Sequence, residues 1–297
     1  MLLDRNNVGL ILRVFATKAE DVAKRVAQTK QLVEKAIAMK VGNKNVFSAI
    51  DILVWNDDRY QDADCGLTAD ALRDAFQSTP FTAKGFAVVS THDFKRGDLF
   101  CGILNYGVVS QLAKRIRYSC IMSPEAIDYL TTENLTAMIG AFNNDVAVAG
   151  LAINELTESV LEGRIANTFA IWDNRALMSV GGFDLRAAKP RDDRTAHYLR
   201  GWHAEKGDVF YHLAGCEEVI PLAHLVDLLG PCIAPILPTD RTAQYQAPNP
   251  ATEPDLWARH LSKLGTKTER QSALLASVGY DLSYLKGGVI PAYRNQC

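Results

Sequence analysis

Acidic side chains stand at points of the chain where polar loops meet apolar segments. Asp57 and Asp58 directly follow one apolar run, Glu125 follows another, and Glu217 and Glu218 open a helical segment. A carboxylate at the start of a helix is well placed to act as a general base, because backbone N–H groups fix its geometry. A carboxylate at the end of a strand can bind a cation or the polar groups of a ligand. The competing explanation is ordinary: acidic residues complement a helix dipole, and Asn-Asp-Asp suits a turn.

An alternation of strands and helices must position these carboxylates. Apolar runs rich in β-formers predict strands at residues 8–16, 50–55, 85–90, 118–122, 146–153, 168–172 and 232–237. Helical spacing predicts helices at residues 18–39, 68–77, 102–114, 124–130, 174–180 and 217–229. This alternation predicts an α/β fold with a mostly parallel sheet flanked by helices, in which ligands bind at the carboxyl ends of the strands.

The composition changes after residue 238. Residues 239–254 are polar and rich in proline, which predicts a linker, and residues 256–278 predict one further helix. Lys263, Lys267 and Arg270 share one face of that helix, and a solvated face is the better expectation for them than a contact with a bound ligand. We therefore expect one α/β domain over residues 1–238, followed by a linker and a C-terminal helical extension over residues 239–297.

Four segments resemble, in the correct order, the inverting glycosyltransferases of family 2. Residues 50–58, IDILVWNDD, are similar to the family's second strand and the acidic pair that contacts the nucleotide base. Residues 102–126, GILNYGVVSQLAKRIRYSCIMSPEA, resemble its helix, strand and metal loop. Residues 168–184, TFAIWDNRALMSVGGFD, resemble its acceptor-side motif, and residues 215–236, GCEEVIPLAHLVDLLGPCIAPI, resemble its catalytic acidic pair with the following helix and strand.

The resemblance implies a GT-A-like (Rossmann-like) fold of the nucleotide-diphospho-sugar transferase superfamily. It also implies a hexosyltransferase-type activity, in which a sugar passes from a nucleotide-diphosphate donor to a hydroxyl acceptor with inversion. Glu218 matches the base of the acidic pair, and Glu217 is its neighbour in substrate binding. Asp192 and Asp193 compete for the base role, but their strongly charged surroundings favour a solvated cluster.

The remaining site residues divide into a donor side and an acceptor side. On the donor side we expect Asp57, Asp58, Asn105, Glu125 and Arg13. Arg13 is a lone charge at the end of the first strand, where a phosphate or base contact and an ion pair with a carboxylate are equally good explanations. On the acceptor side we expect Trp172, which could stack on a sugar or belong to the core, together with Gly181, Gly182 and Asp184.

The chain departs from the family at the metal position and in one long segment. Where the family has Asp-x-Asp, this chain has Ser123-Pro124-Glu125, which retains one carboxylate. One carboxylate weakens the expectation of a tightly held Mg²⁺ or Mn²⁺, so Lys or Arg would neutralise part of the diphosphate. Residues 185–214 form an insert between the acceptor motif and the acidic pair, and its histidines His197, His203 and His212 lack the spacing of a metal site.

Composition narrows the remaining function classes. The 297 residues include 32 basic and 34 acidic side chains, and 48% are hydrophobic, which excludes a disordered chain and gives no support for nucleic-acid binding. We expect no transmembrane segment and no signal peptide, and the scattered cysteines suggest the cytoplasm. The acceptor, a sugar, lipid or protein, is open. Two rival functions remain: a non-catalytic sugar-nucleotide-binding relative, and a nucleotidyltransferase on a related fold.

Overall fold

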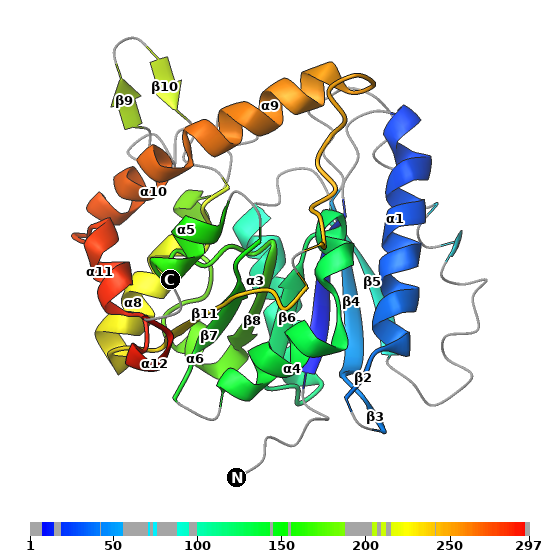
Figure 1. Ribbon diagram of the computed structural model, residues 1–297, viewed down its shortest axis with the longest axis horizontal. Coiled ribbons are helices and arrows are strands. Elements are labelled where there is room, and N and C mark those ends of the chain that lie inside the picture. Colours follow the sequence, from blue (N-terminus) through cyan, green and yellow to red (C-terminus); the bar gives the residue numbers. More distant parts are fainter. Residues whose placement is uncertain are drawn as a thin grey trace.

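The protein is described by a computed structural model (Figure 1). The description covers residues 8–14, 19–41, 43–55, 71, 74–75, 88–94, 100–142, 145–153, 156–187, 204–206, 209–211, 215–240 and 242–294. Within these residues a seven-stranded sheet has the order β11-β7-β8-β6-β1-β4-β5. Its strands are β1 (Val8–Val14), β4 (Phe47–Trp55), β5 (Val88–Phe94), β6 (Tyr118–Met122), β7 (Val148–Leu151), β8 (Phe169–Asp173) and β11 (Ile233–Ile236).

The sheet is mostly parallel, as the alternation of strands and helices predicts. Strand β1 pairs in parallel with β4 and β6, whereas β8 runs antiparallel to both of its neighbours, β6 and β7. The predicted α/β fold, a mostly parallel sheet flanked by helices with a C-terminal helical extension, is therefore confirmed. Of the predicted strand at residues 85–90, residues 88–90 belong to β5, which continues to Phe94. Residues 85–87 and most of the predicted helix at residues 68–77 lie outside the described residues.

Helices cover both faces of the sheet. One face packs against α1 (Ala19–Ala38) and α4 (Thr132–Ala141), and the other against α3 (Phe100–Ala113), α5 (Thr157–Leu161), α6 (Asn174–Ser179) and α8 (Val219–Leu229). Two short 3-10 helices, Pro124–Tyr129 and Leu185–Ala187, follow β6 and α6. Two small antiparallel pairs complete the description: β2 (Lys40–Val41) with β3 (Lys44–Asn45), and β9 (Ala204–Lys206) with β10 (Val209–Tyr211).

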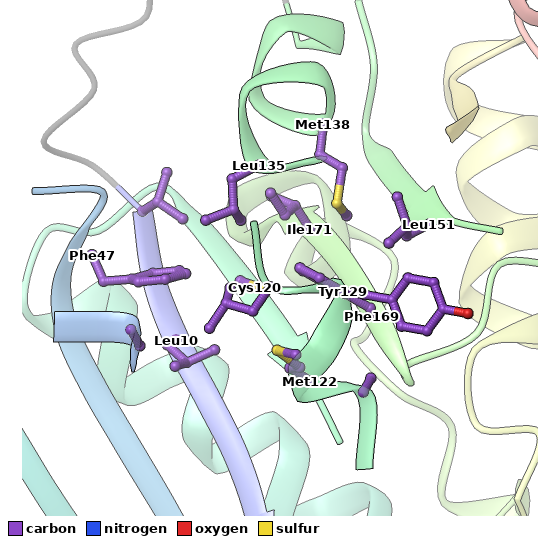
Figure 2. Packing of buried hydrophobic residues seen from close by; sticks show 14 of the residues in the cluster. Leu10, Phe47, Cys120, Met122, Tyr129, Leu135, Met138, Leu151, Phe169 and Ile171 are labelled. Atoms are coloured by element: carbon purple, nitrogen blue, oxygen red, sulfur yellow. The ribbon is translucent and has the colours of Figure 1, made fainter. Parts of the chain in front are cut away.

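The core on the α1 and α4 face is built from side chains that alternate along the strands. Figure 2 shows them converging between β1, β6, β8 and α4: Leu10, Phe47, Cys120, Met122, Tyr129, Leu135, Met138, Leu151, Phe169 and Ile171. Burial of each large apolar side chain contributes roughly 1.5–3 kcal/mol before the cost of chain entropy. Cys120, placed in this core, has its pKa raised by burial and stays a thiol, as its apolar run predicts.

Residues 256–278, predicted as one helix, contain two, and two more helices follow them in the C-terminal segment. These are α9 (Pro254–Gly265), α10 (Lys267–Ala276), α11 (Leu282–Gly287) and α12 (Pro291–Arg294). The break lies at Thr266, whose φ of −103° and ψ of 1° are not helical, and it lets α10 turn onto α8. Leu274, Leu275 and Leu285 join the core of the α8 face, so the extension shares its hydrophobic core with the sheet.

The residues between β11 and α9 lead the chain from one side of the sheet to the other. In Figure 1 this stretch rises toward the top of α1, and α9 then returns across the end of the molecule at which the parallel strands finish. Lys24 of α1 pairs with Glu253 at the start of α9. None of the described helices is long and apolar enough to cross a membrane.

One buried carboxylate ties the edge of the sheet to α3. Asp51 on β4 is fully buried, and its oxygens accept hydrogen bonds from His92 Nε2 (2.8 Å), Gln111 Nε2 (2.5 Å) and Lys114 Nζ (2.6 Å). Burial alone would raise the pKa of Asp51, but the bonds from His92 and Lys114 outweigh it and hold that pKa below its ordinary value. A buried charge of this kind is tolerated because its partners surround it.

We expect Asp51→Asn to lower the free energy of unfolding by about 2–3 kcal/mol at neutral pH, because it leaves Lys114 without its carboxylate partner. The measurement is a urea denaturation series, with the exposed Asp128→Asn as the matched control. A loss no larger than that of the control would contradict this account of the Asp51 contacts.

Candidate active site

Two consecutive carboxylates are buried in the turn that precedes α8. Glu217 is 4% and Glu218 is 2% exposed. The oxygen Oε1 of Glu217 lies 3.1 Å from Arg13 Nη1, and Oε1 of Glu218 lies 3.7 Å from Lys267 Nζ. The side chain of Glu218 makes no capping hydrogen bond to α8, so the simple helix-cap explanation does not account for it. Cations from β1 and α10 compensate these two buried charges instead.

The protonation of Glu218 is set by its surroundings. Burial raises the pKa of its carboxyl group to about 7, Lys267 acts in the opposite direction, and the charge of Glu217 raises it further. A carboxyl group with a pKa near the working pH is suited to take up and release a proton. This property distinguishes Glu218 from a surface acid of the kind that ordinarily begins a helix.

Arg13 lies at the carboxyl end of β1, between two groups of side chains. The sequence left a ligand contact and an ion pair equally open, and the structure shows the ion pair with Glu217. The charge of Arg13 also lowers the pKa values of Glu218 and of Tyr245, which lies on the other side of β1. Arg13 therefore acts electrostatically on both groups.

The second group surrounds Glu125, directly after β6. Arg25 of α1 binds its Oε1 atom, and the hydroxyl of Ser123 donates to its Oε2 atom. Burial raises the pKa of Glu125, but Arg25 and Ser123 outweigh that effect and hold the pKa below its ordinary value. The C-terminal segment closes this group: Gln246 donates its backbone N–H to the Glu125 carbonyl at 2.8 Å, and the side chain of Tyr245 hydrogen-bonds Ser123.

The turn predicted for the acceptor side contains two left-handed glycines, Gly181 (φ 91°) and Gly182 (φ 76°). Asn105 of α3 holds it: Nδ2 donates to the Phe183 carbonyl at 3.0 Å, and Oδ1 accepts from the Phe183 N–H at 2.7 Å. Both polar atoms of Asn105 thus bind the backbone, so its expected role as a nucleotide contact is replaced by support of this turn. Asp184 accepts hydrogen bonds from the backbone N–H and the Nε atom of Arg186 at 2.8 and 2.7 Å.

Trp172, expected on the acceptor side where it could stack on a sugar, belongs to the core instead. Its side chain is fully buried, its Nε1 donates to Asn167 Oδ1 at 2.9 Å, and its ring meets that of Phe183 edge-on at 5.3 Å. A ring in these contacts offers no face to a sugar. Of its two explanations, the core position is the one that the structure supports, because β8 lies inside the sheet and points this side chain into the α6 and α8 layer.

Cys101 lies close to the buried carboxylates without sharing their chemistry. It is fully buried at the start of α3, and burial together with the charges of Glu217, Asp184 and Glu218 raises its pKa, against the effect of Arg13. The side chain therefore stays a thiol, which is a poor nucleophile. Its electrostatic neighbours nonetheless show that the acidic pair, Arg13 and the acceptor-side turn lie in one region.

The C-terminal helices contribute to this region, contrary to the expected solvated face. The side chain of Lys267 is only 13% exposed, and Arg270 is 7% exposed. Arg270 Nη2 donates to the Lys263 carbonyl at 2.6 Å, and its Nη1 lies 3.2 Å from where a Cβ of Gly215 would be. Lys263 itself is exposed. Two of the three predicted surface cations therefore pack against the turn that carries Glu217 and Glu218.

Aromatic contacts hold α9 onto the same edge. The ring of Tyr245 stacks on His260 with centroids 6.1 Å apart and an interplanar angle of 15°, and Trp257 contacts His260 at 5.6 Å. The sequence pattern marked none of Arg25, Ser123, Tyr245 and Lys267 as site residues. A periodic pattern assigns Arg25 and Lys267 only to helices, and their partners are distant in sequence.

Other predicted residues lie outside the described part of the chain. These are Asp57, Asp58, Asp192, Asp193, His197, His203 and His212. Among the described residues, no three His, Cys, Asp or Glu side chains lie together in a group that could hold a metal ion. Glu125 binds a guanidinium and a hydroxyl, and its positively charged neighbour opposes a divalent cation. The described residues therefore do not fit a tightly held Mg²⁺ or Mn²⁺.

Comparisons with known proteins find only distant structural similarity. No protein-family model and no curated protein sequence matches the chain. One similar solved structure is the 4-diphosphocytidyl-2C-methyl-D-erythritol synthase of Anaerococcus prevotii, at 10% identity over 88% of this chain and 98% of that chain, with a TM-score of 0.44. Another is a mannosyltransferase of Pyrobaculum calidifontis in complex with GDP-Man and Mn²⁺, at 15% identity over 93% of this chain and 76% of that chain, with a TM-score of 0.41. At these values the function must be argued from the site itself.

The acceptor-side turn makes a testable prediction about its two glycines. Gly182→Ala should destabilise the protein by at least about 1 kcal/mol more than Gly181→Ala, because both require a left-handed residue but only the first new Cβ meets Asn105 Oδ1, at 2.4 Å. Thermal unfolding of the two variants measures the difference. Equal losses would show that Asn105 does not hold the turn as described.

The raised pKa of Glu218 makes a second prediction, about stability and pH. Its folded-state pKa of about 7 lies above the ordinary 4.5, so its stabilising contribution is complete below pH 4.5 and is lost as pH rises through 7. Glu218→Gln, which resembles the protonated form, should therefore be more stable than the wild type above pH 7, by on the order of 3 kcal/mol.

The measurement is the melting temperature of both proteins between pH 5 and pH 8.5, with the exposed Glu133→Gln as control. A constant difference between wild type and Glu218→Gln over this range would show that Glu218 has an ordinary pKa.

Proposed function

We propose that the protein transfers a hexose from a nucleotide-diphosphate sugar to a hydroxyl acceptor with inversion, and that Glu218 is the general base. The observation behind this proposal is the buried pair Glu217–Glu218, held by Arg13 and Lys267 at the start of α8. The pair occupies the position of the catalytic acidic pair in the family that the sequence resembles. It lies near the carboxyl end of β1, where ligands bind in open α/β sheets.

Inverting transfer is a single displacement at the anomeric carbon. The acceptor oxygen forms a bond to that carbon, the bond to the donor phosphate oxygen breaks, and the nucleoside diphosphate leaves with the electron pair. The acceptor hydroxyl must lose its proton, and an ionised Glu218 accepts it. Because the pKa of Glu218 is raised to about 7, half of its population is ionised near neutral pH, which suits a base at that pH.

The neighbours of Glu218 have supporting roles in this proposal. Glu217, fixed by its ion pair with Arg13, positions the substrate beside the base. The turn of Gly181 and Gly182, with Asp184, forms the acceptor side, and Asp57 and Asp58 contact the donor nucleotide. The burial of both glutamates keeps them away from bulk water, which strengthens the electrostatic interactions around them.

Nucleotide binding is the first test of this function. UDP, GDP and dTDP are titrated separately, each with Mn²⁺ and with EDTA, and the melting temperature is followed. We expect at least one of them to raise it, because a ligand that binds only the folded state stabilises that state. No response to any nucleotide under either condition would remove both the transferase and the non-catalytic binding function.

Donor turnover is the second test. Once the nucleotide is known, hydrolysis of its sugar conjugate is measured for the wild type, Glu218→Gln and the control Glu133→Gln. Loss of a general base should reduce the rate by roughly 100- to 10,000-fold, while nucleotide affinity stays close to that of the wild type. Equal turnover by wild type and Glu218→Gln would exclude Glu218 as the base, and no turnover above background by the wild type would favour the non-catalytic alternative.

A further inference from the structure

We infer that Arg25 and Arg13 bind the diphosphate of the donor in place of a divalent cation. This inference rests on the proposed function, because it concerns how the same site holds a nucleoside diphosphate. It assigns to Arg25, a residue of α1 that no sequence motif marks, the charge-neutralising role that the Asp-x-Asp-bound metal has in the family.

The first step concerns Glu125, the one carboxylate at the metal position. Arg25 binds Oε1 and Ser123 binds Oε2, so both oxygens have partners within the protein. A cation at Glu125 would have to displace a guanidinium that already neutralises the carboxylate. Since Mg²⁺ and Mn²⁺ require several oxygen ligands, displacement of Arg25 for one carboxylate oxygen is unfavourable.

The second step concerns how firmly Arg25 is placed. Its side chain is 24% exposed, and it spans from α1 to the loop after β6. The C-terminal segment packs onto this loop through Tyr245 and Gln246, and Lys24 anchors the same segment to α1 through Glu253. Glu125 thus holds the guanidinium directly, and the C-terminal segment fixes the loop that carries Glu125, which lowers the entropic cost of binding an anion.

The third step concerns Arg13 as the second cation. It lies at the carboxyl end of β1, its side chain is 22% exposed, and Glu217 holds it. Leu12 of β1 is in register with Met122 of β6, so Arg13 and the loop of Ser123 and Glu125, which binds Arg25, lie at the same edge of the sheet. Each guanidinium already pairs with a carboxylate, so a donor phosphate binds it alongside Glu217 or Glu125.

Arginine has the geometry for this task. A guanidinium carries five N–H donors in a planar fork and can bind a carboxylate and a phosphate together. Its charge is permanent at physiological pH, as that of a metal ion is.

The experiment measures the affinity of the nucleoside diphosphate identified by the thermal titration, by calorimetry, with EDTA and with excess Mn²⁺. Under this inference the two affinities of the wild type agree within about threefold. Arg25→Met should weaken diphosphate binding by roughly 10- to 100-fold and reduce the preference for the diphosphate over the monophosphate. The control is Arg175→Met, an exposed arginine on α6.

Glu125→Gln distinguishes neutralisation of the diphosphate by Arg25 from neutralisation by a metal ion, because it changes the affinity for the nucleoside diphosphate in opposite directions in the two cases. If Arg25 holds the diphosphate, loss of the competing carboxylate leaves the affinity equal to that of the wild type or raises it. If Glu125 holds a metal, the same change weakens binding in Mn²⁺. Melting temperatures of the unliganded variants show whether each variant is folded. Glu125→Gln keeps polar atoms for Ser123 and Arg25, so it tests the inference even if Arg25→Met fails to fold.

The failures of the two proposals are distinguishable. If no nucleotide binds under any condition, the proposed function fails and the inference fails with it. If a nucleoside diphosphate binds only with Mn²⁺, or binds Arg25→Met as well as wild type, the proposed function stands and the inference is overturned. Metal-independent binding that requires Arg25 supports both.

Discussion

Two adjacent carboxylates are buried at the carboxyl edge of the sheet, and the arrangement around them follows from the need to compensate their charge. Burial of an ionised carboxylate without a partner is prohibitively costly. Glu217 therefore pairs with Arg13 from β1, and Glu218 approaches Lys267 from α10. The first partner comes from an interior strand of the sheet and the second from the C-terminal helices, so the acidic turn joins the two parts of the chain.

This requirement explains why the C-terminal helices pack as they do. The helix break at Thr266 turns α10 toward α8. This direction of α10 both buries Leu274 and Leu275 and places Lys267 beside Glu218. At the other end of the segment, Tyr245 and Gln246 contact the loop that carries Glu125. The extension therefore acts on both acidic groups of the site, and its apolar packing and its electrostatic contacts reinforce one another.

Glu125 and Glu218 differ in which protonation state their surroundings stabilise. Around Glu125, a guanidinium and a hydroxyl stabilise the ionised form and keep its pKa low. Around Glu218, burial outweighs a more distant lysine and raises the pKa to about 7, so protonated and ionised forms are both populated near neutral pH. A low pKa suits a permanent counter-charge, and a pKa near neutrality suits proton transfer. The same residue type thus serves two electrostatic purposes within one edge of the sheet.

The amino-acid sequence by itself determined the elements, because apolar periodicity depends on neighbours within a few positions. The strands at β1, β6 and β8, the glycine turn and the order of the acidic groups along the chain all follow from it.

Tertiary structure decided which of these residues meet. Trp172 and Asn105 were expected to touch ligands, but burial inside the sheet layer and contact with Phe183 give them structural roles. Arg25 and Lys267 lie on helices whose local pattern indicates only a charged face, and they reach Glu125 and Glu218 because the chain brings distant segments together at the carboxyl edge. No local pattern encodes such long-range pairing, since its free energy arises only when both partners are desolvated in the folded protein.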